Sequence, residues 1–281
     1  NTGTIAGEGD IVTDIESNEL ITTNIQVGIN KTIGCAGFEV VAKAYSFGYN
    51  SQGLNTIREF DPYTEVETVI FTNKTDSGGL DILPLNPQYY VNDIKLIQGK
   101  YLPFTDATMQ PCYVNIDRLK DGSYGVVTQE DLRLIKALPQ IIPTTSYQDD
   151  ESRSNNLLHG NLFQIIEQFV YLDDEYSAWG SYSKRAVPEE ESTPSIGTNV
   201  SKDNWLLVKV SAGTNRVKTI NVGARIGTLD FALIKSVSRA DVIALPEEEV
   251  DIANLIYEAY NPATNIYSFA FYNDGLYANI D

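Results

Sequence analysis

Residues 161–188, NLFQIIEQFVYLDDEYSAWGSYSKRAVP, indicate most directly which kind of fold the sequence encodes. From 163 to 171 the side chains alternate between two faces with the period of two that belongs to a β-strand. One face carries Phe163, Ile165, Glu167, Phe169 and Tyr171. The triplet DDE at 173–175 predicts a turn, and residues 176–187 are expected to return as a second strand that ends before Pro188.

The sequence that follows this hairpin continues in the same way. A third strand is predicted at 204–210 (NWLLVKV), and another alternating run follows it. Near the end, the NDG of 265–281 predicts a hairpin turn between two aromatic strands. Strands of this length with Trp and Tyr on buried faces are typical of an immunoglobulin-like or fibronectin-type sandwich. We predict such a sandwich at 141–212, and further β-strands with one short helix at 213–281.

The first 140 residues form a different pattern, in which short strands follow one another as meanders. Strands are predicted first at 38–47, 56–60 and 65–72, and then at 89–97, 101–106 and 113–117. The meander thus recurs with a period near 50 residues, which is typical of β-propeller blades, although a plain β-sandwich would also give short strands and frequent turns. Residues 138–156 are irregular, and a domain boundary is expected there.

Helical periodicity is scarce in this sequence. The two best windows are 130–137 and 247–260, the second with acidic residues in its first turn, where the helix dipole favours them. The predicted fold is therefore all-β, with partial β-propeller-like meanders, an inserted immunoglobulin/fibronectin-type sandwich and few short helices. Because the alternation is still running at Asp281, we expect the polypeptide to continue beyond this sequence.

Charge is the strongest global feature of the chain. It contains 38 acidic and 20 basic residues, a formal net charge of −18. Such a protein repels phosphate backbones and anionic membranes, although solubility alone would also explain the charge. No stretch is long and apolar enough for a transmembrane helix. Cys35 and Cys112 are too few for a disulfide framework and have the wrong spacing for a zinc site.

Candidate nucleophiles and bases are few. His159 is the only histidine, so a Ser-His-Asp or Cys-His arrangement would have to use it, and its place before a strand suits an exposed turn residue. Cys112 has no neighbouring basic cluster that would stabilise a thiolate. The sequence contains neither of the glycine-rich motifs that bind nucleotide phosphates. It also lacks basic clusters, the nearest being the single pair Lys184-Arg185.

Paired carboxylates are the remaining candidates for chemistry. Asp106 and Asp117 are predicted at the ends of adjacent strands, and a glycosidase needs two such groups facing a cleft. In a chain this acidic, chance pairs are unavoidable. The run Asp173-Asp174-Glu175 lacks the spaced ligand loop of a calcium site and is interpreted as a solvated hairpin turn. The sequence therefore predicts no catalytic, metal-binding or cofactor-binding residue, and no cofactor.

Two stretches resemble the tail muzzle or nozzle proteins of crAss-like and related short-tailed phages, a likeness that covers roughly residues 35–281. In that family a strand of the form YLYWTD precedes NxPRKIN, and a later strand pair reads FxxRYxYxDGExSAxSxxS. The first motif is matched by Tyr101, Leu102, Phe104, Thr105, Asp106, Pro111, Asn115 and Ile116. The second is matched by Phe163, Tyr171, Asp173, Glu175, Ser177, Ala178, Ser181 and Ser183. The chain departs from the family at Pro103, and at Cys112, where a basic residue is usual.

The resemblance implies a non-enzymatic virion protein of the phage tail. Copies of such a protein, with other tail proteins, form a ring around the channel through which the genome leaves, and carry propeller-like and sandwich domains. Genomic DNA would pass without sequence-specific binding. An acidic channel wall would help, because negative charge repels phosphates whereas a basic wall would bind them.

Two other functions remain open at this point. One is a secreted or surface β-propeller module that binds glycans through exposed rings such as Trp179 and Trp205. The other is a glycoside hydrolase that uses an acidic pair such as Asp106 and Asp117.

Overall fold

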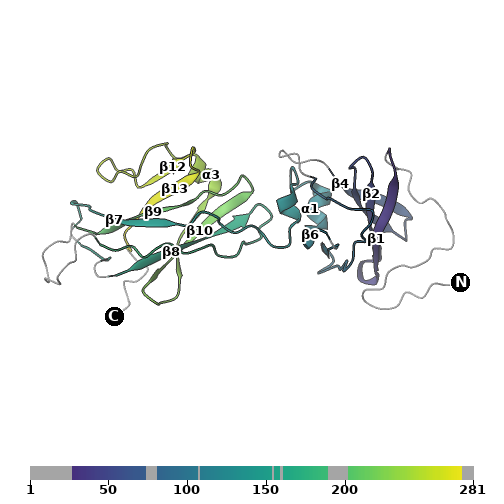
Figure 1. The fold of residues 1–281 in the computed structure, drawn as a ribbon, viewed down its shortest axis with the longest axis horizontal. Coiled ribbons are helices and arrows are strands. Elements are labelled where there is room, and N and C mark those ends of the chain that lie inside the picture. Colours follow the sequence, from purple (N-terminus) through teal and green to yellow (C-terminus); the bar gives the residue numbers. More distant parts are fainter. Residues whose placement is uncertain are drawn as a thin grey trace. The chain divides into compact units, whose positions relative to one another are not determined.

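The structure is a computed structural model that describes residues 27–73, 81–106, 108–153, 155–158, 161–188 and 202–273. The chain divides into two compact units, unit 1 (Asn1–Ile135) and unit 2 (Lys136–Asp281), drawn as a ribbon in Figure 1. Antiparallel strands make up most of the regular structure in each unit, so the fold is mainly β, as predicted. The sequence predicted a boundary within 138–156, and the structure divides the chain between Ile135 and Lys136.

Unit 1 is built on a four-stranded antiparallel sheet with the order β1-β2-β3-β4. Its strands are Asn30–Phe38, Lys43–Asn50, Thr56–Asp61 and Val66–Thr72. Neighbours in the sheet are neighbours in sequence, so the first meander is present. The strand predicted at 38–47 is wrong at its start, because Glu39–Val41 form a 3-10 turn, η1, and Ala42 has a φ of 49°.

The second predicted meander is only partly formed. β5 (Tyr101–Phe104) and β6 (Cys112–Asn115) pair as a hairpin. The strand predicted at 89–97 is wrong, since this segment contributes two isolated bridges. Asp93 and Gln98 have φ values of 49° and 54°, and such left-handed residues interrupt an extended backbone.

The two short helices of unit 1 follow this hairpin. α1 (Ile116–Asp121) begins where the end of a strand was predicted, because the Asn115 side chain accepts a hydrogen bond from the backbone three residues on (3.3 Å) and caps the helix. α2 (Gln129–Leu132) has a Thr128–Asp131 capping box. The helix predicted at 130–137 is therefore real but shorter, and it ends before the unit boundary.

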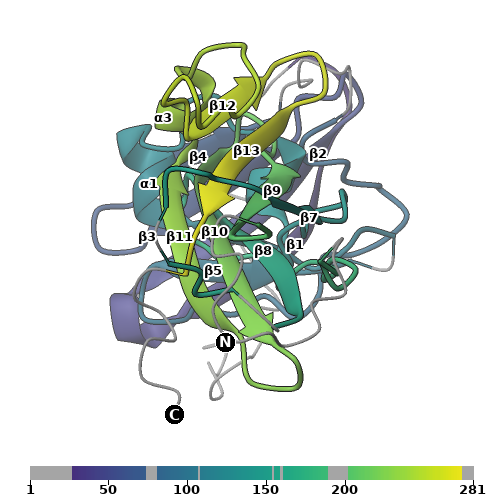
Figure 2. The same cartoon turned by 90° about the vertical axis from the view of Figure 1, so that its left-hand side faces the viewer.

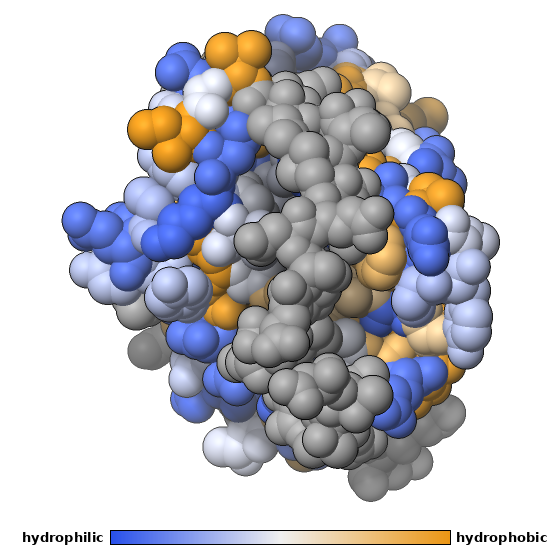
Figure 3. All heavy atoms as spheres, turned by 90° about the vertical axis from the view of Figure 1, so that its right-hand side faces the viewer, coloured by the Kyte–Doolittle hydropathy of each residue, from blue (hydrophilic) through white to orange (hydrophobic). Residues whose placement is uncertain are grey.

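The core of unit 1 joins the sheet to the hairpin and helices. Its fully or nearly fully buried side chains include Ile33, Phe47, Ile57, Leu83, Leu102, Phe104, Val114, Ile116 and Leu132. Phe47 of β2 and Phe104 of β5 pack with ring centroids 4.5 Å apart. On the face shown in Figure 3, the coloured hydrophobic side chains lie in separate spots between hydrophilic ones.

Unit 2 consists of two antiparallel sheets that share one core. The first has the order β11-β10-β8, with bounds Ala232–Ser238, Val217–Ile226 and Phe163–Tyr171. The second, visible in Figure 2, has the order β12-β13-β9-β7, with bounds Glu258–Asn261, Ile266–Phe271, Trp205–Ser211 and Thr144–Gln148. The shared core includes Phe163, Ile165, Phe169, Val208, Val210, Ile220, Val222, Tyr267 and Phe269.

The alternation that predicted β8 is confirmed, but the predicted division of unit 2 is not. β8 pairs with β10, and β9 pairs with β13, so strands on both sides of residues 212 and 213 belong to the same sheets. A sandwich confined to 141–212 would leave these strand edges unpaired. The segments 141–212 and 213–281 therefore form one unit.

The helix predicted at 247–260 is wrong. Asp251 and Ile256 form an isolated β-bridge around a turn in which Leu255 has a φ of 62°, and β12 begins at Glu258. The helix of this region is α3 (Arg239–Ile243), whose N-terminus is capped by the Ser238 side chain. Among the described residues no helix is long and apolar enough to cross a membrane. His159 and the last two residues of the predicted NDG turn, 274 and 275, lie outside the described residues.

Candidate functional site

Asp106 and Asp117, the predicted acidic pair, have separate structural roles. Asp106 is buried, and its Oδ1 accepts hydrogen bonds from the backbone N–H groups of Thr108 (2.6 Å) and Met109 (2.7 Å), which closes the turn after β5. Asp117 is exposed in the first turn of α1, a position that the helix dipole favours. Neither residue lines the pockets at Trp205 or at Arg58, the two that the described residues form most clearly.

Cys112 is buried in the core of unit 1, beside the Asp106 turn. Burial, followed by the nearby Asp106 carboxylate, raises the pKa of its thiol to about 12. The thiol therefore stays protonated near neutral pH and is a poor nucleophile. Cys35 is half-buried, and burial raises the pKa of its thiol as well.

The turn Asp173-Asp174-Glu175 is confirmed, but one of its acids is not solvated. Asp173 forms an ion pair with Lys136 (Oδ2 to Nζ 2.5 Å), and the two side chains are only 4% and 3% exposed. Asp174 pairs with Lys218 at the surface. Among the described residues no group of His, Cys, Asp and Glu is arranged to hold a metal ion.

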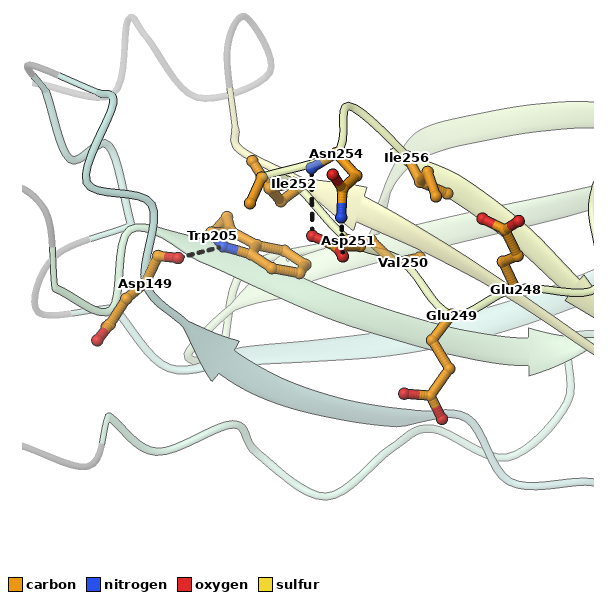
Figure 4. Close-up of a pocket in the computed structure, with 10 residues that line it drawn as sticks. Asp149, Trp205, Glu248, Glu249, Val250, Asp251, Ile252, Asn254 and Ile256 are labelled. Atoms are coloured by element: carbon orange, nitrogen blue, oxygen red, sulfur yellow. Dashed lines mark hydrogen bonds between the residues drawn. The ribbon is translucent and has the colours of Figure 1, made fainter.

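An open pocket of about 610 Å³ lies on unit 2, between the start of β9 and the loop that precedes β12. Trp205 forms part of its wall and donates its indole N–H to the Asp149 carbonyl (3.1 Å), as Figure 4 shows. The other lining residues are Glu248, Glu249, Val250, Asp251, Ile252, Ala253, Asn254 and Ile256. The pocket is thus acidic at its rim and apolar at its wall, and no basic side chain lines it.

The segment 176–187 was predicted as a strand, but its residues up to Ala186 contact the edge of β8 that β10 leaves free at every third residue. The backbone N–H groups of every third residue, Ser177, Gly180, Ser183 and Ala186, donate to the carbonyls of every second residue of β8, Phe169, Glu167, Ile165 and Phe163. The segment is therefore not a regular strand, because a ladder pairs residues two by two.

Two serines fix this segment through the same set of hydrogen bonds, and we call each set a serine bracket. The Ser177 hydroxyl accepts from the Phe169 N–H (3.0 Å) and donates to the carbonyl of the next residue (2.7 Å). The Ser183 hydroxyl likewise accepts from the Ile165 N–H (2.9 Å) and donates to the next carbonyl (2.8 Å). In each bracket a glutamine of β8 also donates its side-chain amide to the carbonyl of the serine.

The period of three buries the serines and leaves large side chains exposed. Tyr176, Trp179 and Tyr182 are 61%, 41% and 56% exposed, and Arg185, at the next step, is exposed too. Trp179 lies over β10, since a Cβ atom added to Gly223 would be 3.7 Å from its indole ring. The rings are thus held on the outer face of the sheet, away from the core.

Arg225 of β10 joins these rings into a cluster. Its guanidinium lies 5.3 Å from the ring centre of Tyr182 and 4.7 Å from that of Phe231. Its Nη2 and Nε donate to the Gln164 side-chain oxygen (2.8 and 3.1 Å). We call Trp179, Tyr182, Arg225 and Phe231 the aromatic–arginine face. Sequence patterns did not predict it, because its members come from three separate segments.

Glu167 is a further titratable group that the sequence did not single out. It lies on the core side of β8 and is fully buried, with Oε2 accepting from the Ser211 N–H (2.9 Å) and Oε1 lacking any hydrogen-bond partner. Burial raises the pKa of this carboxyl to about 8, against the opposing effect of the Ser211 hydrogen bond. The sequence signal for Glu167 is a single acid among apolar residues on one face of an alternating strand.

No family model matches the chain, and no curated protein is significantly similar to it. Function therefore has to be inferred from the geometry of the residues themselves.

Proposed function

We propose that this chain is a structural protein of a phage tail, a muzzle or nozzle subunit that forms part of the ring around the DNA exit channel. The observation that carries the proposal is the structural role of the residues that match the two family motifs. Several of these residues form hydrogen bonds or packing contacts within the fold. Such internal contacts are expected of a structural protein.

The first motif builds a hairpin and the turn and helix that follow its strands. Asp106 closes the turn after β5, and Asn115 caps α1. Tyr101 and Tyr113 stack across the hairpin with ring centroids 5.2 Å apart. The motif residues Tyr101, Asp106 and Asn115 thus have structural roles that require no substrate.

The second motif builds the edge of unit 2. Ser177 and Ser183 supply the serine brackets, and Asp173 supplies the buried ion pair with Lys136. Phe163 and Tyr171, at the two ends of β8, lie in the core. The first and last serines of this stretch, Ser177 and Ser183, are thus explained by one structural device.

The acidity of the chain also suits a channel protein. A net charge of −18 gives a wall that repels the DNA phosphates, so that DNA slides without being held. Of the two rings named for the glycan-binding alternative, Trp205 is only 5% exposed, whereas Trp179 is 41% exposed. The glycosidase alternative has less support, because Asp106 closes a turn and Asp117 lies in the first turn of α1.

Electron microscopy of the purified full chain tests the proposal. We expect closed rings with a central channel and a fixed number of subunits. Isolated particles that hydrolyse a chromogenic glycoside, with hydrolysis lost in Asp106→Asn, would contradict it. Binding on a glycan array that disappears with Trp179→Ala would favour the glycan-binding module instead.

A further inference from the structure

We propose that the aromatic–arginine face of unit 2 docks onto an acidic ridge, Glu247, Glu248 and Glu249, of a second copy of this chain. The inference deepens the proposed function and rests on it, since it names the contact by which the ring is built.

The face contains the residue types that dominate protein interfaces. Trp, Tyr and Arg are the side chains most enriched among the few that carry most of the binding energy. Here Trp179 and Tyr182 are half-exposed, and Arg225 is held by Gln164 and two rings. Because Arg225 and Tyr182 already contact each other and Phe231 in the free protein, little conformational entropy is lost when they are covered.

Charge points to an acidic partner. Arg225 makes no ion pair with any described residue, and its partners are an amide oxygen and two ring faces. Lys184 and Arg185, exposed on the adjoining segment, likewise pair with no described acid. A guanidinium offers a planar fork of donors that matches a carboxylate, so this face is complementary to exposed glutamates.

The acidic ridge supplies such glutamates on the same unit. Glu247, Glu248 and Glu249 are consecutive and exposed, and they make no ion pair with described residues. Figure 4 shows Glu248 and Glu249 on the loop before Asp251, well apart from Asp149. Beside the ridge, the 610 Å³ pocket offers an apolar wall of Val250, Ile252 and Trp205 that a ring of the partner can enter.

The two surfaces belong to different sheets of unit 2. Ile220, Val222 and Ala224 of β10 point into the core, so Gly223 and Arg225 lie on the outer face of the first sheet. Leu206 and Val208 of β9 point into the same core, so Trp205 and its pocket lie on the outer face of the second. Two different surfaces that bind each other form a head-to-tail contact, and such contacts build rings when the rotation closes.

Two variants test the aromatic–arginine face and the acidic ridge separately. Arg225→Glu reverses the charge of the face, and Glu248→Lys with Glu249→Lys reverses the ridge. Each variant alone is expected to lose assembly, with subunit affinity falling roughly 30-fold or more, as for a hot-spot residue. An equimolar mixture is expected to regain assembly, because the intact ridge of one variant meets the intact face of the other and the two reversed surfaces also carry opposite charges.

Analytical ultracentrifugation measures these masses. Matched controls are Lys95→Glu, and Glu39→Lys with Glu65→Lys, which make the same charge changes at exposed sites of unit 1. They are expected to assemble like the natural sequence. Circular dichroism reports whether each variant folds, and Arg225→Gln, which removes the charge without reversing it, carries the test if Arg225→Glu unfolds.

The outcomes distinguish the inference from the function. If the natural sequence assembles and the Arg225 and ridge variants assemble equally well, the inference is wrong and the structural function stands. If the natural sequence stays monomeric, both the inference and the proposed function are contradicted. Dimers that form equally within each variant alone would show a symmetric contact and would also overturn the inference.

Discussion

At the scale of single residues, Glu167 is a fully buried carboxyl group whose hydrogen bonds are only partly satisfied. Its carboxyl lies in the core of unit 2 with one oxygen unpartnered, and burial raises its pKa from 4.5 to about 8. Between these pH values the native state binds more protons at this site than the unfolded state does. The stability of unit 2 should therefore fall as pH rises from about 4.5 to about 8.

Glu167→Gln should remove this dependence. At one pKa unit for each ~1.4 kcal/mol, the variant gains up to about 5 kcal/mol relative to the natural sequence above pH 8, and little near pH 4. Urea unfolding at a series of pH values measures the difference. Glu248→Gln, on an exposed loop, is the control and should leave the dependence unchanged; an unaltered slope in Glu167→Gln would contradict the assignment.

The Asp173–Lys136 pair makes a second prediction at this scale. Asp173→Asn removes one carboxylate of a buried ion pair, and the loss of one partner of such a pair is expected to lower the free energy of unfolding by about 3–5 kcal/mol. Asp174→Asn is a matched control in the same turn, because its pair with Lys218 is half-exposed and contributes less than about 1 kcal/mol. Equal effects of the two substitutions in thermal unfolding would show that the Asp173 pair is not buried in solution.

At the scale of elements, the serine brackets decide how segment 176–186 is attached to β8. Ser177→Ala and Ser183→Ala each remove the acceptor of a buried β8 N–H, which costs about 1–3 kcal/mol. Ser181→Ala changes an exposed serine between them and should stay within about 0.5 kcal/mol of the natural sequence. Hydrogen exchange of the Phe169 and Ile165 amides provides the direct readout, and protection that survives the bracket substitutions would refute this role.

These elements also show what sequence can and cannot predict here. β8 was found because its two faces alternate over nine residues. Segment 176–187 was wrongly predicted as a strand. Every third residue of it contacts β8, an arrangement that Ser177 and Ser183 fix and that a search for alternating side chains does not detect. The helix predicted at 247–260 is wrong although the apolar residues there have helical spacing. The Asp251 turn and the φ of Leu255 are set by local contacts, which this spacing does not reveal.

The candidate site was harder to predict than the fold. Asp106 and Asp117 were considered because acids near strand ends are easy to find in sequence. The aromatic–arginine face depends on strand pairing, since Arg225 meets Gln164 across the β8–β10 register and meets Phe231 after a turn. Such a cluster is defined only once the sheet order is known.

At the scale of the whole molecule, charge gives a prediction about DNA. A chain with net charge −18 should not retain duplex DNA even at low ionic strength, where electrostatic attraction would be strongest. Fluorescence anisotropy with a labelled duplex tests this. Binding that weakens steeply with added salt would mean that a basic surface has formed in the assembly, contrary to an acidic channel wall.

The central claim is that this mainly β chain is a building block, and the mass of the purified full chain in solution tests it most directly. Mass photometry should find one dominant species at a fixed multiple of the subunit mass, six- or twelve-fold for a nozzle ring. A population that remains monomeric across the accessible concentrations would contradict the account.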